Sequence, residues 1–295
     1  MIVLIGATSF IGPTVLKKLL EKDYEVKCFV KSGTDISSLQ QTASALKKEI
    51  TLARGNLNSA DTIFSCAKKA EAIVYLTDLK NSYYVKNTLS SAARAGVKRI
   101  VFLGSTTVLV PQETKIKQDK IASEKMIEKS GLDYTILRAS MIYGSENDTN
   151  FSKMIKYIKD KGYFYLFGKG DNLIQPVYIE DVATAIAEVI ANEKTYNKTY
   201  ELAGKEPIKY SQMLDIVKEK MGLDFKIRKV PMGLASFIVS IYSKMSKNPH
   251  LTPDQIQRLK YDKTYSYSQA QQDFGFSPLS FEQGIEKLVN RLKLQ

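Results

Sequence analysis

Histidine and cysteine are almost absent from this 295-residue chain, which has one histidine and two cysteines. The single histidine, His250, stands in the polar stretch NPHLTP, so the sequence offers no His/Cys cluster for zinc and no histidine base for a serine hydrolase. Cys28 falls in an expected strand and Cys66 in an expected helix. Two such residues do not make a disulfide framework, and they indicate a reducing compartment.

Long apolar runs are also missing. No stretch reaches the roughly 18 to 20 apolar residues that a membrane-spanning helix needs. Met1 leads directly into an apolar strand, without the basic leader and cleavage site of a signal peptide, and no repeat or low-complexity tract interrupts the chain. With 44% hydrophobic and 25% charged residues, the composition is that of an ordinary globular protein. We expect a cytoplasmic protein.

The net charge of +12 raises the question of a nucleic-acid partner. The lysines, however, are scattered along expected helix faces, as at Lys17, Lys18, Lys47 and Lys48, and they do not form an arm or an aromatic-interleaved patch. The pattern therefore predicts solvated helix faces and no nucleic-acid partner. An anionic ligand such as a dinucleotide would account for part of the remaining charge.

The first twelve residues, MIVLIGATSFIG, predict a dinucleotide-binding turn. Residues 2–5 form a continuous apolar strand, Gly6 ends it, and Gly12 falls in the first turn of an amphipathic helix. Strand, glycine turn and helix together place backbone N–H groups against a pyrophosphate. Ser9 stands where the usual fingerprint has its middle glycine, which leaves a plain strand-to-helix turn as the alternative.

Strands and helices then alternate up to about residue 145, which predicts a parallel sheet with helices on both faces. We therefore expect an α/β, Rossmann-type doubly wound fold with a smaller C-terminal α/β substrate lobe. The NAD(P)-binding core would cover residues 1–145, with a strand and a helix contributed from about 172–203. Residues 146–295 would form the smaller, mostly helical substrate or partner lobe.

Residues at the carboxyl ends of the strands make up the predicted cofactor site, because ligands of such sheets bind there. Lys31 follows the second strand, where NAD-selective folds carry an acid for the ribose 2′-hydroxyl. A cation there predicts a 2′-phosphate and hence NADP, in preference to NAD, with a solvated strand end as the alternative. Asn56 and Leu57 follow the third strand, where an adenine ring could be held. Further cofactor-binding candidates at strand ends are Leu76, Thr77 and Ser140.

Several segments resemble those of a known family: GATSFIG, AGVKRIVFLGST, SEKMIEKSGLDYTILRASMIYG, QPVYIEDVATAI and TYELAGKEPIKYSQMLDIV. In order and over nearly the whole chain, they resemble the extended and atypical short-chain dehydrogenase/reductases. The nearest group is the NmrA-like branch, which includes the NADPH-binding accessory subunit of respiratory complex I. The resemblance implies a NAD(P)-binding Rossmann core whose phosphate loop is formed by Thr8, Ser9, Phe10 and Ile11.

The resemblance also implies an active site, in which Ser105 matches the family serine and Lys120 the family lysine. The tyrosine position of that site is Ile116, which cannot exchange a proton. Lys120 would then bind the nicotinamide ribose, or supply the proton itself as in the similar isoflavone-reductase branch. Tyr143, in MIYG, is a further candidate proton donor, with packing as its alternative. Asp181 is interpreted as a helix cap.

Three functions remain open on this sequence. The first is an NADP-dependent oxidoreductase that transfers hydride to a small carbonyl, enone or quinone without the usual tyrosine. The second is a non-catalytic NAD(P)H-binding redox sensor or assembly factor, which Ile116 favours. The third, a nucleotide-sugar epimerase or dehydratase, normally needs the tyrosine and tightly held NAD.

An unusually apolar helix is predicted over residues 233–245 (GLASFIVSIYSKM), with Lys244 and Lys247 at its end. We expect this helix to be packed in the core or in a homodimer. Peripheral contact with a membrane surface or with a partner is the alternative. The sequence does not identify the substrate.

Overall fold

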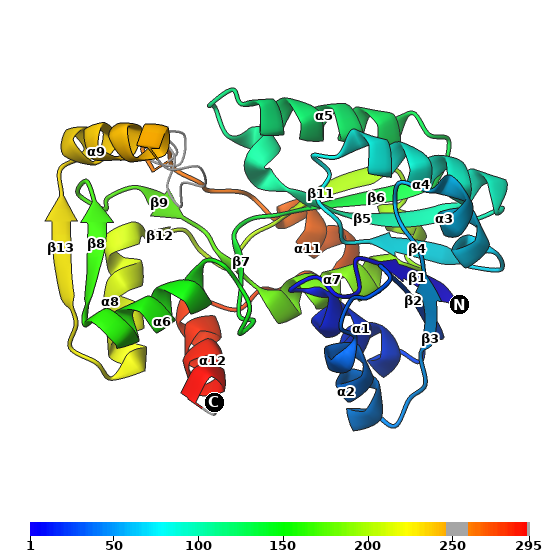
Figure 1. Cartoon of the computed structure of the whole chain (residues 1–295), viewed down its shortest axis with the longest axis horizontal. Helices are drawn as coiled ribbons and strands as arrows, with labels where there is room; N and C mark the ends of the chain where they lie inside the picture. Colours follow the sequence, from blue (N-terminus) through cyan, green and yellow to red (C-terminus); the bar gives the residue numbers. More distant parts are fainter. Residues whose placement is uncertain (246–258, 294–295) are drawn as a thin grey trace.

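A seven-stranded parallel sheet forms the centre of the computed structural model, which describes residues 1–245 and 259–293. The strands follow the order β3-β2-β1-β4-β5-β6-β11 (Figure 1). Their bounds are β1 Ile2–Ile5, β2 Val26–Val30, β3 Thr51–Arg54, β4 Ala72–Tyr75, β5 Arg99–Ser105, β6 Asp133–Ala139 and β11 Lys198–Leu202. The order reverses between β1 and β4, where doubly wound sheets bind their ligands. The predicted Rossmann-type α/β fold is confirmed.

Helices cover both faces of this sheet, which is why β1 is buried on both sides. Ile2 and Leu4 belong to the core on the side of α1 and α7, whereas Val3 and Ile5 belong to the core on the side of α3 and α4. On the first side lie α1 Gly12–Glu21, α2 Ser37–Ala45, α7 Ile179–Val189 and α11 Ser268–Phe274. On the second lie α3 Ala60–Ala67, α4 Ser82–Arg94 and α5 Lys115–Glu128. Two short 3-10 helices are η1 Thr106–Leu109 and η2 Glu193–Thr195.

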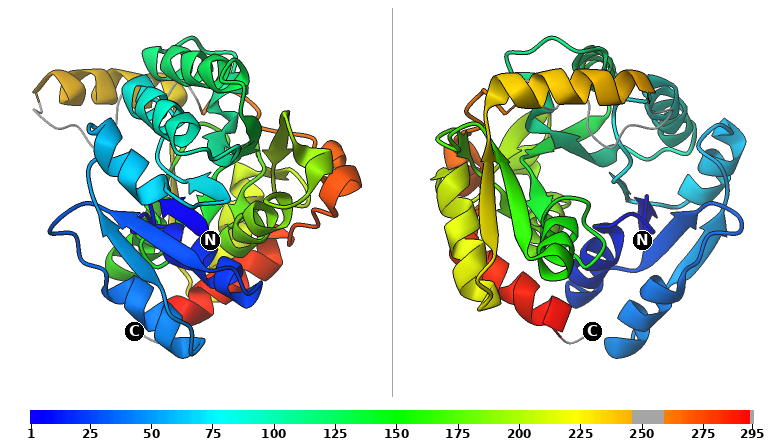
Figure 2. Two further views of the ribbon diagram at one scale, coloured as in Figure 1. Left: turned by 90° about the vertical axis from the view of Figure 1, so that its right-hand side faces the viewer. Right: turned by 60° about the vertical axis from the view of Figure 1, so that its left-hand side comes forward.

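The smaller lobe lies beside the carboxyl ends of the parallel strands (Figures 1 and 2). Its helices are α6 Phe151–Lys161, α8 Tyr210–Met221, α9 Met232–Met245 and α12 Phe281–Lys293. Three two-stranded sheets accompany them, namely β7 with β10, β9 with β12 and β8 with β13. Their bounds are β7 Ile142–Tyr143, β8 Tyr163–Phe167, β9 Leu173–Ile174, β10 Val177–Tyr178, β12 Ile208–Lys209 and β13 Lys226–Val230. The strand β8 pairs with β13 in parallel, so even this lobe joins segments far apart in the sequence.

Arg291 of α12 ties the two lobes together. Its guanidinium donates to the carbonyl of Gly144 at 2.6 Å and to the Glu180 carboxylate at 3.4 Å.

The interpretation of Asp181 as a helix cap is wrong, because the N-cap of α7 is Tyr178 and makes no side-chain cap bond. The Asp181 carboxylate instead accepts a hydrogen bond from the backbone N–H of Leu279 at 2.9 Å.

The predicted apolar helix over residues 233–245 is present as α9, which begins at Met232. None of the helices in the part of the chain that the structure describes is long and apolar enough to cross a bilayer. His250 and Lys247 lie outside the described residues.

Candidate functional site

The turn between β1 and α1 requires glycine at two positions. Gly6 has a φ of +83°, in the left-handed region that side chains disfavour. A Cβ atom on Gly12 would lie 1.9 Å from the carbonyl oxygen of Ala7, so α1 starts directly against the turn. The N–H of Ser9 donates to the Gly6 carbonyl and the N–H of Gly12 to the Ser9 carbonyl, both at 2.9 Å. This is the compact strand-to-helix turn that the sequence predicts.

The side chains of this turn leave polar groups open to a ligand. Ser9 Oγ is buried and has no hydrogen-bond partner among the residues described. Thr8 and Phe10 are exposed and line a hollow of about 890 Å³ that extends along α1 and α2 to Arg291. Ile11 is buried, so only its backbone can reach a ligand. The Ser9 hydroxyl thus lacks a partner at the N-terminus of α1, in a turn that requires glycine at positions 6 and 12. Such a site suits a pyrophosphate.

The ends of β2 and β3 present two exposed polar residues. Lys31 is exposed, and it has no ion pair with any residue in the described ranges. The nearby Asp35 carboxylate is occupied at the start of α2, where it accepts hydrogen bonds from the N–H and hydroxyl of Ser37. Asn56 is exposed too, although its Oδ1 accepts from the N–H of Asn58 at 2.9 Å. Lys31 is therefore available to an anion at this edge.

The remaining cofactor candidates are less accessible. Leu76 is buried, and Leu57 and Thr77 are half-buried. The hydroxyl of Ser140 donates to the carbonyl of Gln175 at 2.6 Å, so its proton is already used within the protein. These residues lie at strand ends as predicted, and their contact with a cofactor stays a prediction.

Lys120 is held at this edge by an ion pair with Asp78, which follows β4. The Nζ atom lies 3.0 Å from Asp78 Oδ1. Burial raises the pKa of Asp78, but the hydrogen bond from the N–H of Lys80 and the charge of Lys120 outweigh it, and the pKa lies below its usual value. Asp78 is therefore charged at neutral pH. An ammonium group has three N–H donors, so two remain for a ligand, because Asp78 is the partner of Lys120 among the described residues.

A second ion pair fixes α5 over the sheet. Glu124, one turn after Lys120, is buried with its Oε2 2.8 Å from Nη2 of Arg138 on β6. A further bond of 3.3 Å joins Arg138 Nε to Glu124 Oε1, so the pairing is bidentate and directional. It holds α5 in a fixed orientation, with Lys120 towards Asp78. In the first turn of the same helix, Ile116 is 43% exposed, at the position of the family tyrosine.

Ser105 ends β5, and its hydroxyl is paired with Thr107. Ser105 Oγ accepts a hydrogen bond from the N–H of Thr107 at 3.2 Å and lies 2.9 Å from Thr107 Oγ1, where either oxygen can be the donor. The Ser105 hydroxyl can therefore donate either to Thr107 Oγ1 or to the oxygen of a ligand. In both cases Ser105 Oγ still accepts from the backbone N–H of Thr107.

Tyr143 does not fit a catalytic position, and its assignment as a proton donor is corrected. The side chain is wholly buried, and its phenol donates to the carbonyl of Phe281 at 3.3 Å. The rings of Phe151, Tyr178 and Phe281 lie between 5.0 and 5.6 Å from its own. Burial raises the pKa of Tyr143 well above its ordinary value. The residue packs the junction of β7, α6 and α12.

Tyr265 is a phenol at this edge that the sequence analysis does not single out. It lies in the segment 259–267, which runs from the smaller lobe to α11, and its N–H donates to Gln175 Oε1 at 2.8 Å. Burial raises the pKa of Tyr265, and a hydrogen bond with the side chain of Thr106 partly opposes this. Thr106 directly follows Ser105, so the fold brings a tyrosine beside the residue matching the family serine. No local pattern connects positions so far apart.

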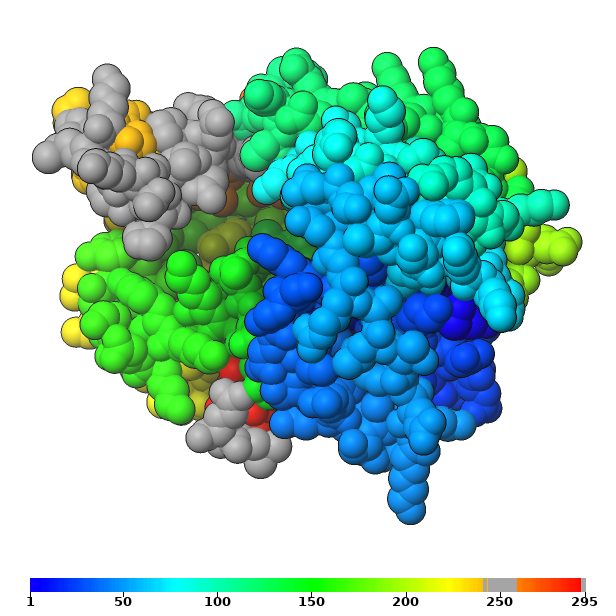
Figure 3. All heavy atoms as spheres, turned by 45° about the vertical axis from the view of Figure 1, so that its right-hand side comes forward, coloured from blue at the N-terminus to red at the C-terminus, as the bar shows by residue number. Residues whose placement is uncertain are grey.

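An apolar cavity of about 470 Å³ begins beside Met141, the residue that follows Ser140. Figure 3 shows the molecule hollowed between its two lobes on this side. The polar residues in the cavity lining are Asn150 and Lys153, apart from the tyrosine hydroxyls. Aromatic side chains dominate the walls contributed by α6, β8 and α8, namely Phe151, Tyr157, Phe164, Tyr165, Phe167 and Tyr210. Such walls favour a flat, apolar molecule.

Several relatives and solved structures match most of this chain. The chain is 22% identical to the chloroplastic divinyl chlorophyllide a 8-vinyl-reductase of Cucumis sativus, covering 97% of this chain and 72% of the relative. It is 23% identical to the mitochondrial NADH dehydrogenase [ubiquinone] 1 alpha subcomplex subunit 9 of Arabidopsis thaliana, covering 88% and 70%. The NADPH-dependent quinone oxidoreductase QOR2 of Escherichia coli, complexed with NADPH, has the same fold with a TM-score of 0.77 and 20% identity, covering 98% and 99%.

Two family descriptions match the chain. The RmlD substrate binding domain matches residues 111–294, which include the smaller lobe. The NAD(P)H-binding family matches residues 6–193, from the glycine turn to the end of α7 and beyond. The chain therefore belongs to the NAD(P)H-binding family, within the NmrA-like branch of extended short-chain dehydrogenase/reductases that its sequence resembles.

Proposed function

We propose that this protein is an NADPH-dependent reductase of a small apolar carbonyl compound, enone or quinone. The observation that carries the proposal is the aromatic-lined cavity of about 470 Å³ beside the carboxyl ends of the strands. Among its described lining residues, Lys153 is the only charged one. A nucleotide sugar would place a diphosphate against mostly apolar walls, at a cost that an apolar ring avoids. The cavity therefore favours a reductase over an epimerase.

NADPH is the cofactor that the residues at the strand ends fit. When bound, its nicotinamide supplies the hydride. The N–H groups of the turn that are not already bonded within it, together with the orphaned Ser9 hydroxyl, would bind the pyrophosphate. Lys31, exposed and without an ion pair among the described residues, would bind the 2′-phosphate. The likeness to a quinone oxidoreductase crystallised with NADPH supports this assignment.

The chain's own residues would orient the reactants and deliver a proton. Lys120, directed by Asp78, has N–H donors left for the ribose hydroxyls. Ser105 would donate to the substrate oxygen while it accepts from Thr107. Two groups can then protonate that oxygen, the Lys120 ammonium and the phenol of Tyr265, whose pKa burial raises.

The test is NADPH oxidation with a panel of quinones, enones and aldehydes, with cofactor binding followed by NADPH fluorescence in the same samples. Lys120→Met is expected to lower kcat by about 100-fold or more while NADPH still binds, because it removes both the orienting donors and a proton source. Lys125→Met is the matched control, since Lys125 is an exposed residue of the same helix. An unchanged rate in Lys120→Met would overturn the assignment of this lysine.

Two further variants test the proton donor and the cavity. Tyr265→Phe removes the hydroxyl and keeps the ring. A loss of kcat with unchanged NADPH affinity therefore identifies Tyr265 as the proton donor. Met154→Trp fills the cavity and is expected to raise KM for quinones about tenfold without changing the NADPH dissociation constant. Turnover that is indifferent to the size of residue 154 would place the substrate elsewhere.

Ile116 favours the second candidate, a non-catalytic NADPH-binding protein. It sits exposed at the position of the family tyrosine and offers no proton. That function predicts NADPH binding without turnover of any acceptor in the panel, and it is distinguished by the same experiment.

A further inference from the structure

Helix α9 exposes its apolar side chains instead of burying them. Leu234, Phe237 and Ile238 are 51%, 65% and 51% exposed, while Ala235 and Val239 are buried. The three exposed residues follow an i, i+3, i+4 spacing, so they form one stripe along the helix. Figures 1 and 2 place α9 along the outer margin of the smaller lobe. Packing in the core does not account for these three exposed side chains.

A basic hollow adjoins the start of this helix. Lys169, Lys229 and Lys260 line it together with Pro231 and Met232, in a space of about 680 Å³. All three lysines are exposed, and none has an ion pair with any residue in the described ranges. Asp171 is a carboxylate in the same lining, so the hollow keeps an excess of positive charge.

The glycine-rich segment FGKGDN lines one side of this hollow. Gly168 and Gly170 both have a φ of +76°, which turns the backbone around Lys169. Asn172 also lines the hollow, and its Nδ2 is buried with no hydrogen-bond partner among the residues described. Cations and an unused amide donor around one space suit an oxygen-rich anion such as a phosphate group.

We propose that this protein docks on an anionic phospholipid surface, with the stripe of Leu234, Phe237 and Ile238 in the interfacial region and the lysines of the hollow on the headgroup phosphates. Apolar side chains beside basic ones are the combination that binds such a surface. A second copy of the chain is disfavoured as the occupant, because it would bring the same lysines together. A nucleic acid would leave the exposed Leu234 and Ile238 of the stripe without an apolar partner. The docking does not depend on the proposed reductase activity.

The test is flotation of the full chain with vesicles of phosphatidylcholine alone and of phosphatidylcholine containing phosphatidylglycerol. We expect binding about tenfold tighter or more to the anionic vesicles, and its loss at high salt, because three lysines face the surface. The double variant Phe237→Ser, Ile238→Ser is expected to weaken binding about tenfold or more. The double variant Lys229→Glu, Lys260→Glu is expected to abolish the preference for phosphatidylglycerol.

Matched controls distinguish binding through this face from non-specific apolar binding and from an effect of the net charge. Leu223→Ser removes an equally apolar side chain, 43% exposed, beyond the other end of β13. Lys98→Glu, Lys125→Glu reverses two exposed lysines of the core. Both controls are expected to leave vesicle binding unchanged, and circular dichroism checks the fold of every variant.

Four results would overturn the proposal. The first is no flotation with anionic vesicles, and the second is equal loss of binding in the control variants. The third is a dimer in light scattering that Phe237→Ser, Ile238→Ser converts to a monomer, which would assign the stripe to a second copy. The fourth combines two observations. Soluble inositol hexakisphosphate releases the protein from the vesicles, whereas uncharged sucrose or salt of the same ionic strength does not. In addition, the double variant Phe237→Ser, Ile238→Ser binds the vesicles as well as the unsubstituted protein. That result would make the hollow a site for a free phosphate and not for a lipid.

Discussion

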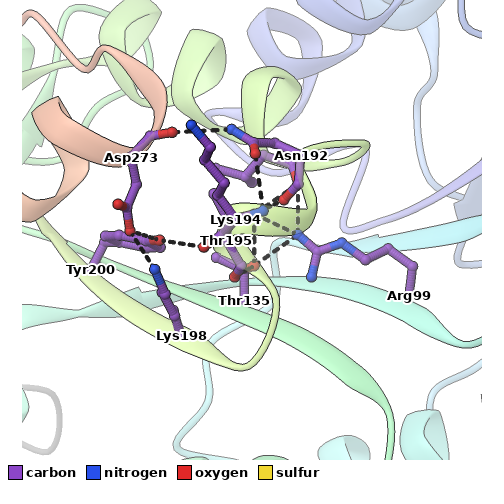
Figure 4. A network of polar contacts seen from close by, with 9 residues as sticks. Arg99, Thr135, Asn192, Lys194, Thr195, Lys198, Tyr200 and Asp273 are labelled. Atoms are coloured by element: carbon purple, nitrogen blue, oxygen red, sulfur yellow. Dashed lines mark hydrogen bonds and ion pairs between the residues drawn. The ribbon is translucent and has the colours of Figure 1, made fainter.

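The two ends of the central sheet differ in how completely their polar groups are used. At the amino end, the buried Arg99 guanidinium binds five partners and stacks 4.2 Å from the ring of Tyr196. Figure 4 shows its contacts with Thr135 and Thr195. The partners are the carbonyls of Asp133, Val189 and Ile190 and the hydroxyls of Thr135 and Thr195. Val189 and Ile190 end α7, whose last carbonyls would otherwise lack partners. Burial lowers the pKa of Arg99 to about 10, which still leaves it charged at neutral pH.

The network at the amino end continues through Asp273 of α11. Its carboxylate accepts from the Tyr200 phenol at 2.6 Å and from Lys198 Nζ at 2.7 Å, and its carbonyl accepts from Asn192 at 3.2 Å (Figure 4). Together these contacts fasten α7, η2, β11 and α11 to the sheet.

At the carboxyl end, by contrast, polar groups are left without partners in the described part of the chain. Ser9 Oγ is orphaned, Lys31 has no ion pair, and Lys120 uses one donor on Asp78. A satisfied buried network stabilises the fold, whereas unsatisfied groups gain their partners only from a ligand. One end of the same strands thus stabilises the fold, and the other is the end that we propose binds the cofactor.

The largest effect is expected from Arg99→Met, which removes the central residue of the hydrogen-bond network at the amino end of the sheet. The substitution leaves several buried carbonyl and hydroxyl groups unpaired, so we expect a loss of about 3 to 5 kcal/mol in the free energy of unfolding. Denaturant titration measures it, with Lys98→Met as the exposed neighbour that should change stability by less than about 0.5 kcal/mol. NADPH affinity of the folded fraction should not change. A substantial loss of affinity would mean that the two ends are coupled.

At the carboxyl end, Gly12→Ala is expected to weaken NADPH binding about 100-fold. Its Cβ would lie 1.9 Å from the Ala7 carbonyl and would push α1 away from the turn. Fluorescence titration with NADPH measures the change. In the control Gly233→Ala, the added methyl group meets nothing within 4 Å, so binding should be unaffected. Normal affinity in Gly12→Ala would show that the cofactor does not depend on this turn.

Lys31→Asp tests the carboxyl end of the sheet. It reverses the charge of a residue that has no ion pair in the described part of the chain. We expect NADPH to bind about 10- to 100-fold more weakly, because a carboxylate faces the 2′-phosphate, and NADH to bind about as before. Stability should stay within about 0.5 kcal/mol, since the residue is exposed. Equal affinity of the unsubstituted protein for both cofactors would contradict the assignment of NADP.

The smallest effect concerns Asp181, in the first turn of α7. Burial raises its pKa from 3.8 to about 6, although the hydrogen bond from Leu279 opposes this. The folded state then binds the proton more tightly than the unfolded state. The stabilisation from the protonated carboxyl is therefore full below about pH 4 and is lost as pH rises through about 6.

Asp181→Asn keeps an acceptor for the Leu279 N–H and removes the charge. We expect it to stabilise the protein by about 1 to 2 kcal/mol at pH 8, after allowance for partial solvation, and to have little effect at pH 4. Urea unfolding of both proteins at the two pH values measures the difference. A variant whose effect is the same at both pH values would show that Asp181 does not titrate in this range.

The features that sequence alone established are those encoded by neighbouring residues. The alternation of apolar strands with amphipathic helices determined the Rossmann-type sheet, because burial on one or both faces imposes a short period on the chain. Gly6 and Gly12 determined the turn, since their positions admit no side chain. Ser105 and Lys120 were found through the family resemblance, and both lie at the carboxyl edge.

Tertiary structure decided what depends on contacts between distant segments. Tyr143 resembles a residue near the cofactor in its local motif, yet α6 and α12 enclose it in the core. Asp78 and Tyr265 carry no signal of their own. They join the site only because β4 ends beside β5 and because the segment 259–267 brings Tyr265 to Thr106. The stripe on α9 is equally apolar whether it is buried or exposed, so its sequence could not say which side faces the interior. Local pattern determines which elements form, whereas the packing of distant elements determines which of their side chains remain free to bind.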